Sequence, residues 1–210
     1  KVFKSILPAP FTIAVVLTFC TLLLALIFTR SESEGPHFLQ LLSFWEQGIW
    51  HPPLLVFAMQ MMLMLVLGHV LALTKPINYL IEKGTSLCDT TSNAAAIITF
   101  FTLCVSLFNW GLGLIFGAIF ARKVGEHANK NNIKLNYALI GAAGYSGLMV
   151  WHGGISGSAP IKIAEQSHFL ASKMGVISQS ETVFSTMNIS ISIALLIILP
   201  LTMYYLGKKE

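Results

Sequence analysis

Long apolar runs separated by short polar segments dominate the chain, and this alternation predicts membrane-spanning helices. Three runs have the length of a simple span: Ala9–Phe28, closed by TRSESEGP; Pro53–Leu73, closed by TKP; and Thr186–Leu206, closed by GKKE. About 20 apolar residues are needed to cross roughly 30 Å of hydrocarbon, so each run suffices for one crossing.

The segment before the second run has a different pattern. From Phe38 to Trp50, apolar residues recur at positions 38, 41, 42, 45 and 49, which lie on one face of a helix. Trp45 and Trp50 suit the boundary between water and lipid. We predict an interfacial helix here, and a second, weaker one over residues 77–84 (INYLIEKG).

The segment Ala94–Ala121 is too long for a simple span, because it holds 28 residues without a charge. One straight helix of that length would measure about 42 Å. Its middle reads FNWGLG (108–113), with a polar Asn109 and two glycines. A re-entrant hairpin with its turn at Asn109–Gly113 is the alternative to a steeply tilted helix. Such a turn needs protein or water around it.

The basic residues decide between these two readings. With a cytoplasmic N-terminus, a hairpin leaves ten Lys and Arg residues inside and three outside, namely Arg30, Lys162 and Lys173. A full crossing leaves six inside and seven outside. Cytoplasmic loops are enriched in Lys and Arg. The count therefore predicts the hairpin, entering from the cytoplasm, and both termini on the cytoplasmic side.

The fourth span is interrupted. Leu135–Val150 has only 16 residues, about 24 Å of helix, and WHGGISGSAP (151–160) follows it. Either the helix ends in a surface loop, or the chain is unwound at membrane depth and a new helical piece starts near Ser158. In that case Ser158 is the expected N-cap and Pro160 lies in the first turn. Lys162, Glu165 and His168 would share a helix face that lines a cavity or has left the membrane.

Composition narrows the class of protein. The chain is 55% hydrophobic and 10% charged, whereas soluble domains carry about 25% charged residues. Its net charge of +4 comes from dispersed residues without interleaved aromatics, so we expect no nucleic-acid partner. The three cysteines form no CxxC, and no HExxH, carboxylate pair or serine-nucleophile motif occurs. We predict neither an enzyme nor a bound cofactor.

The two glycine-rich breaks are predicted to meet near the membrane midplane. Ends of discontinuous helices expose N–H groups, which favour a carboxylate without a buried arginine. The hairpin tip would contribute Asn109, Trp110, Gly111 and Gly113. The broken helix would contribute Trp151, His152, Gly153, Gly154, Ser156, Gly157 and Ser158.

Alternatives remain for these residues. Both breaks are also compatible with simple kinks or surface turns. Trp110 and Trp151 either pack or form the wall of an acyl pocket, and His152 either packs or carries a coupling proton. Unwound carbonyls near Asn109 and Ser156 are the expected place for Na⁺, if that ion is coupled.

The segments FNWGLGLIFGAIFARKVG (108–125) and GYSGLMVWHGGISGSAP (144–160) resemble the short-chain fatty acid transporters, the acetoacetate and butyrate carriers of bacteria. That family is similar in organisation to the ion-transporter superfamily. The resemblance implies an all-α membrane protein with two inverted repeats, each holding a re-entrant hairpin and a broken helix, in the bacterial inner membrane. It also implies alternating access around a short-chain fatty acid, coupled to H⁺ or Na⁺.

Members of that family are longer than this chain. Residues 1–210 would then be a single transmembrane domain, the first repeat, and a second repeat or another chain would complete the site. The alternative is a structural or assembly subunit of the membrane that does not transport, with glycines that allow tight helix packing.

Overall fold

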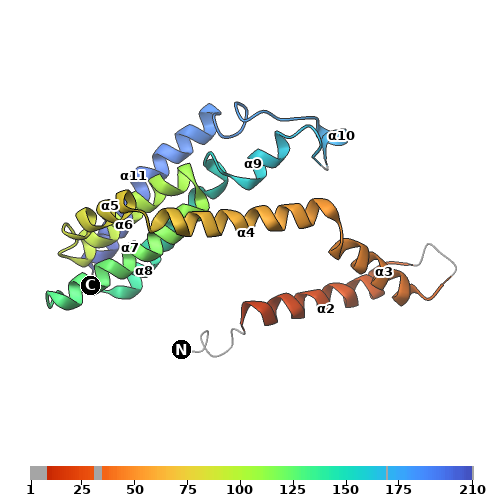
Figure 1. Ribbon diagram of the computed structural model, residues 1–210, viewed down its shortest axis with the longest axis horizontal. Coiled ribbons are helices and arrows are strands. Elements are labelled where there is room, and N and C mark those ends of the chain that lie inside the picture. Colours follow the sequence, from red (N-terminus) through yellow and green to blue (C-terminus); the bar gives the residue numbers. More distant parts are fainter. Residues whose placement is uncertain (1–8, 31–34, 169, 210) are drawn as a thin grey trace. The chain divides into compact units, whose positions relative to one another are not determined.

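The computed structural model describes residues 9–30, 35–168 and 170–209, and every regular element in these ranges is helical (Figure 1). Four helices there are long and apolar enough to cross a membrane, in α2, α4, α6 and α11. The predicted class, an all-α membrane protein, is therefore confirmed. In chain order the elements are α2 (Pro10–Phe28), α3 (His37–Ile49), α4 (Pro52–Ala72), α5 (Lys75–Thr85), α6 (Thr91–Phe108), α7 (Trp110–Lys130), α8 (Tyr137–Tyr145), the 3₁₀ helix η1 (Ser146–Gly153), α9 (Ser158–Ile163), α10 (Ala171–Met174) and α11 (Thr186–Lys208).

The chain divides into two compact units, Lys1–Met61 and Met62–Glu210. The first holds α2, α3 and the beginning of α4. Helix α2 matches the first predicted span, and α3 is the predicted amphipathic helix. Trp45 and Trp50 are 55% and 69% exposed, as side chains at a lipid boundary require.

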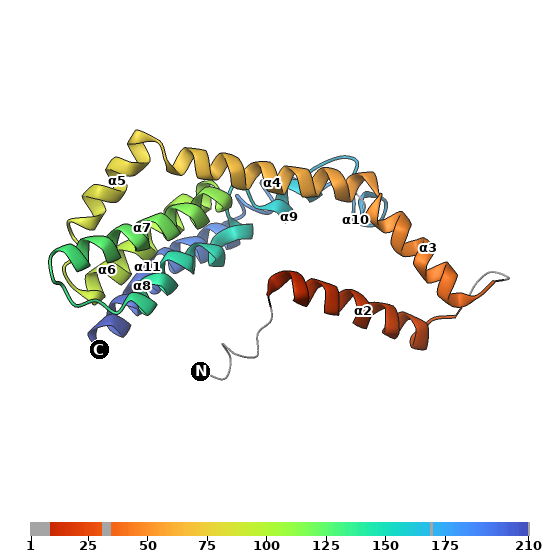
Figure 2. The same ribbon diagram turned by 60° about the horizontal axis from the view of Figure 1, so that its bottom comes forward.

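In the second unit, α6 and α7 form an antiparallel helical hairpin (Figure 2). Gly113 lies against Ser106, and Gly117, one turn further along α7, lies against Thr102, one turn earlier in α6. Further along, the rings of Phe101 and Phe120 meet edge to face, with centroids 6.4 Å apart. The two arms therefore run in opposite directions along their length. The depth of this hairpin in the membrane stays a prediction.

Helices α8, η1 and α11 complete a bundle around α6. Gly144 of α8 packs on the backbone of Gly117, and Gly207 of α11 packs on the backbone of Ser92. The Asn136 N–H donates to Thr91 Oγ1 over 3.1 Å. These contacts bring the start of α6, the start of α8 and the end of α11 to one end of the bundle. The three segments next to Lys residues that were predicted to be cytoplasmic therefore lie at the same end of the bundle.

Helix α6 is the central helix of this unit. Of its 18 residues, 44% are buried, whereas none is buried in the most apolar 18-residue stretch of α11. Ile98 and Leu103 of α6 and Phe116 and Phe120 of α7 are almost fully buried. Helix α11 instead exposes apolar side chains such as Ile197, which suits contact with lipid.

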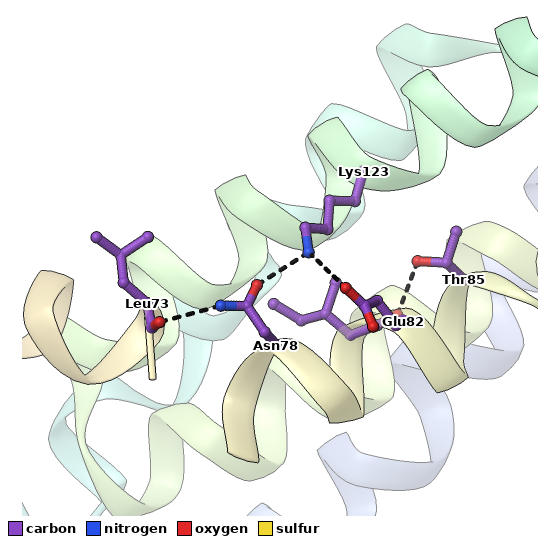
Figure 3. Close-up of polar contacts among 6 residues, drawn as sticks. Leu73, Asn78, Glu82, Thr85 and Lys123 are labelled. Atoms are coloured by element: carbon purple, nitrogen blue, oxygen red, sulfur yellow. Dashed lines mark hydrogen bonds and ion pairs between the residues drawn. The ribbon is translucent and has the colours of Figure 1, made fainter. Parts of the chain in front are cut away.

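Helix α5 packs on the base of the hairpin (Figure 3). The Lys123 ammonium group donates to Asn78 Oδ1 over 2.9 Å and pairs with Glu82 Oε1 at 3.4 Å. The Asn78 amide in turn donates to the carbonyl of Leu73, where α4 has just ended. Gly84 lies against the Phe120 ring. One face of α5 is therefore bound to α7, while Tyr79 and Leu80 remain exposed on the weaker of the two predicted interfacial segments.

The hairpin turn is tighter than predicted. Only Asn109 leaves the helical conformation, at φ −148° and ψ 114°, whereas Gly111 and Gly113 lie in the first turn of α7. The arms are also longer than expected, because Thr90 caps α6 before Ala94 and α7 continues past Ala121 to Lys130. The glycines contribute close packing rather than the turn itself.

The broken helix is confirmed, but its first piece is shorter than Leu135–Val150. Regular α-helix ends at Tyr145, and the chain continues as the 3₁₀ helix η1. Frequent glycines lower helix propensity over this stretch. Ser158 is not the N-cap: Gly157 occupies that position, and Ser158 is the first residue of α9. Pro160 lies in the first turn, as predicted.

The predicted polar face after the break is wrong, because α9 ends at Ile163. Lys162 and Glu165 instead form a 2.6 Å ion pair. His168 is 3% exposed, and its Nε2–H donates to the Gly175 carbonyl over 2.8 Å. These side chains therefore hold a loop together.

Close packing of α7 on α8 predicts an asymmetric response to added side chains. A Cβ at Gly117 would run into the Gly144 carbonyl, whereas nothing lies within 4 Å of one at Gly141. Gly117→Leu should lower the free energy of unfolding by about 1–3 kcal/mol or more. Gly141→Leu is the matched control and should unfold at the wild-type temperature. Thermal unfolding in detergent measures both, and equal stability of the two variants would contradict the packing described.

Burial, with a smaller contribution from Asp89, raises the pKa of the Cys88 thiol from 9.0 to about 12. The folded state therefore binds this proton more tightly than the unfolded state, and the resulting stability is present below pH 9 and lost as the pH rises towards 12. Cys88→Ser should weaken this alkaline loss. In folded protein at pH 8, we expect maleimide to leave Cys88 unmodified until detergent denaturation exposes it.

Candidate functional site

The candidate site is the junction where the hairpin tip meets the break after η1. Asn109 links the two arms, and its extended backbone ends α6 by donating to the Val105 carbonyl over 2.8 Å. Its side-chain Oδ1 accepts the Leu112 N–H at 2.9 Å. Asparagine is among the best N-cap residues for this reason. One residue therefore ends the first arm and caps the second.

Two hydrogen bonds join the break to this tip. The Ile155 N–H donates to the Leu107 carbonyl over 2.8 Å, at the end of α6. The Trp110 N–H, at the start of α7, donates to Ser156 Oγ over 2.9 Å. The break thus satisfies one orphan carbonyl and one orphan N–H of the hairpin. The two breaks predicted from the sequence do meet in the structure.

Glycines allow this approach. A Cβ at Gly154 would lie 2.6 Å from the Leu107 carbonyl oxygen, and one at Gly157 would lie 2.8 Å from that of His152. Gly111 is covered by Met64 of α4, and Gly68 of the same helix packs on the backbone of Leu112. Larger residues at these positions would separate the break or α4 from the tip.

Aromatic rings lie across the same junction. Trp110 and Trp151 stack with ring centroids 4.6 Å apart, and His152 stacks on Trp151 at 4.8 Å. Trp110 is 7% exposed, whereas His152 is exposed. Both indole nitrogens are buried, and neither has a hydrogen-bond acceptor among the described residues. An unmet buried donor costs about 1–3 kcal/mol, so these two groups require an explanation.

The tip holds both the positive N-terminal end of α7 and the negative C-terminal end of α6. The side-chain oxygens of Asn109 and Ser156, near which unwound carbonyls were predicted to hold Na⁺, both accept N–H groups from the start of α7. On the α7 side, the N–H groups of this helix end favour an anion. The Gly111 N–H has no hydrogen bond within the part of the chain that is described. The α7 side of the tip therefore offers a backbone N–H donor.

The remaining predicted residues lie around this junction. The Gly153 carbonyl faces α11 rather than the tip, Gly113 packs in the hairpin seam on Ser106, and Ser158 begins α9. None of the described hydrogen bonds or ring contacts joins Ser158 to the hairpin.

Sequence reasoning missed Asn188. Its side-chain amide donates to the Gly153 carbonyl over 2.9 Å and to the Val183 carbonyl over 2.8 Å, which ties the start of α11 to the break. A polar amide at the beginning of an apolar span was the available signal.

A row of hydroxyl groups on α6 was also missed. Thr99, Thr102 and Ser106 are fully buried, and their hydroxyls have no partner among the described residues. Their spacing of three and four residues places them on one face of α6, against Gly113, Gly117 and Gly147. Small hydroxyl residues at such spacing are typical of tightly packed membrane helices.

An open hollow of about 440 Å³ lies elsewhere, near the end of α7. Arg122, Glu126 and Tyr137 are among the residues that line it. Arg122 and Glu126 form an exposed ion pair at 2.8 Å. This hollow belongs to the hairpin base and not to the junction.

These features define a multi-pass helical membrane protein in which a hairpin tip meets a discontinuous helix. The chain belongs to the short-chain fatty acid transporter family, whose model matches residues 1–210. This is a family of transporters and not of enzymes, as predicted.

Two relatives are similar over most of the chain. A candidate short-chain fatty acid transporter of Escherichia coli strain K12 is 34% identical over 194 residues, covering 92% of this chain and 42% of that protein. One from Haemophilus influenzae strain Rd is 34% identical over 211 residues, covering 97% of this chain and 45% of that protein. The chain thus spans less than half the length of either relative. No solved structure matches it.

The junction predicts that Ser156 stabilises the hairpin tip. Ser156→Ala removes the acceptor of the Trp110 N–H and should destabilise the protein by about 1–3 kcal/mol. Hydrogen exchange at the Trp110 amide should accelerate. Ser158→Ala removes a hydroxyl two residues away that has no described bond to the hairpin, and it should leave both measurements unchanged. Unchanged exchange at Trp110 in Ser156→Ala would show that this hydrogen bond does not protect the tip.

Proposed function

We propose that the protein takes part in the secondary transport of short-chain monocarboxylates, such as butyrate and acetoacetate, by alternating access. The observation that carries this proposal is the junction itself, where the N-terminus of α7 meets an unwound segment through two hydrogen bonds. Membership in the transporter family and the names of the two relatives support it.

A carboxylate suits the α7 end of this junction. The Gly111 N–H and the partial positive charge at the N-terminus of α7 both favour an anion. His152 is the one ionisable residue in the segment 151–160, so no fixed carboxylate in the break opposes a negative ligand. Neighbouring apolar side chains would surround the short acyl chain.

Alternating access requires that the tip and the break separate and rejoin. The bonds from Ile155 to Leu107 and from Trp110 to Ser156 are the contacts that would open and close. Because both are single hydrogen bonds between neutral groups, each contributes only about 0.5–1.5 kcal/mol net. A bound carboxylate can compete with interactions of that size.

Coupling to H⁺ or Na⁺ completes the proposal. The α7 end of the tip favours the substrate anion, so a coupling Na⁺ would bind to unwound carbonyls and not to the side chains of Asn109 and Ser156. A second inverted repeat, or another chain, would supply the rest of the binding surface, since this chain spans less than half of its relatives.

We also propose an inner-membrane location, with both ends of the chain in the cytoplasm. The distribution of Lys and Arg supports it, and so do the contacts that gather Thr91, Asn136 and Gly207 at one end of the bundle. In a cysteine-free variant, Asn131→Cys should react with an impermeant maleimide only after cells are opened. Ser178→Cys should react in intact cells. The opposite pattern would reverse the proposed orientation.

Uptake of labelled butyrate by cells or proteoliposomes that contain the full-length protein tests the function. Gly154→Leu should abolish uptake, because a side chain there would push the break away from Leu107. Gly141→Leu, which meets no neighbour, is the matched control and should transport normally.

The tight glycine seam of α7 and α8 favours a purely structural subunit as the second candidate. If well-expressed wild-type protein takes up no butyrate, the structural subunit becomes the better assignment.

A further inference from the structure

The buried indole groups at the junction point to a more specific assignment. We propose that the indole N–H groups of Trp110 and Trp151 donate hydrogen bonds to the carboxylate of the transported substrate. This inference rests on the proposed transport function and names the side chains that would recognise the substrate's charged end.

The chemistry of the side chain limits what these groups can bind. An indole nitrogen donates one hydrogen bond and accepts none, so its partner must be an acceptor. Trp110 is 7% exposed, both nitrogens are fully covered, and no acceptor among the described residues reaches either one. Native proteins rarely leave such donors unpaired in their interior.

The position of the two rings fits an anionic ligand. Trp110 is the first residue of α7, so its indole belongs to the residue that begins the positive end of a helix of 21 residues. Trp151 lies in η1 and stacks on it with ring centroids 4.6 Å apart. The hairpin and the broken helix thus each provide one donor to the same small region.

A carboxylate has two oxygens and about four acceptor positions, enough for both indoles and the Gly111 N–H. Neutral donors bind it without the desolvation that an Arg or Lys would suffer inside a membrane. Because one donor belongs to each element, a ligand held by both would link the tip to the break. Separation of the two elements is the motion that would give the ligand access.

Replacement by another aromatic residue that lacks the donor tests this assignment. Trp110→Phe and Trp151→Phe keep an aromatic ring and remove only the donor and part of the ring area. Each should raise the KM for butyrate uptake by about 10- to 100-fold, with little change in maximal rate or thermal stability. Trp45→Phe and Trp50→Phe make the same chemical change at exposed positions and should leave the KM unchanged.

A packing role would produce a different result, namely a lower unfolding temperature and a reduced maximal rate at wild-type KM. That result, or a wild-type KM in both junction variants, overturns the inference while the transport function stands. Wild-type protein without any butyrate uptake overturns the transport function, and this inference falls with it.

A binding measurement keeps the test informative if the phenylalanine variants fold poorly. In protein in which Trp45, Trp50 and any tryptophan outside residues 1–210 are replaced by phenylalanine, only Trp110 and Trp151 fluoresce as tryptophan. Butyrate should change their emission with a midpoint near the uptake KM, while the uncharged analogue butyramide should have a much weaker effect. Emission that does not respond to saturating butyrate, in protein that transports it, contradicts direct contact.

Discussion

Backbone that leaves the helical conformation in a buried place must find hydrogen-bond partners within the protein, and the rest of this structure depends on how that requirement is met. The break after η1 supplies an N–H donor to the Leu107 carbonyl at the end of α6. It also supplies the Ser156 hydroxyl as the acceptor for the first N–H of α7. Asn109 satisfies both arms at the turn. Each irregular segment thus satisfies hydrogen-bonding groups that the other leaves open.

Close contact between helices is the second condition. Gly117 and Gly144 let the backbones of α7 and α8 touch, and Gly113 and Gly147 accommodate the hydroxyl row of α6. Dispersion forces and helix contact replace the hydrophobic effect in lipid, where apolar side chains gain little by leaving the solvent. The glycines therefore have two separable uses, one in the bundle seam and one at the junction. Gly154 and Gly111 belong to the junction, whereas Gly117 belongs to the seam.

Sequence patterns predicted the spans, the hairpin and the break because each follows from a local rule of length, charge or glycine content. The positive-inside count depends only on both ends of the hairpin lying on one side, so it predicts a topology without the length of the arms. Two of the caps were harder to predict, because Thr90 and Gly157 each compete with neighbours that have similar capping propensity. The Asn188–Gly153 hydrogen bond and the Trp110–Trp151 stack join residues more than 30 positions apart, and no local pattern encodes them.

The hairpin is held at both its tip and its base by one continuous stretch of chain. Gly68 and Met64 of α4 lie against Gly111 and Leu112 at the tip. Near the base, Asn78 and Glu82 of α5 bind the Lys123 ammonium group. Only Leu73 and Thr74 separate α4 from α5. If the hairpin rotates, α5 and the end of α4 would therefore move with it. The 3₁₀ helix η1 is then the part of the unit that can deform most easily, because 3₁₀ hydrogen bonds have poorer geometry than those of an α-helix.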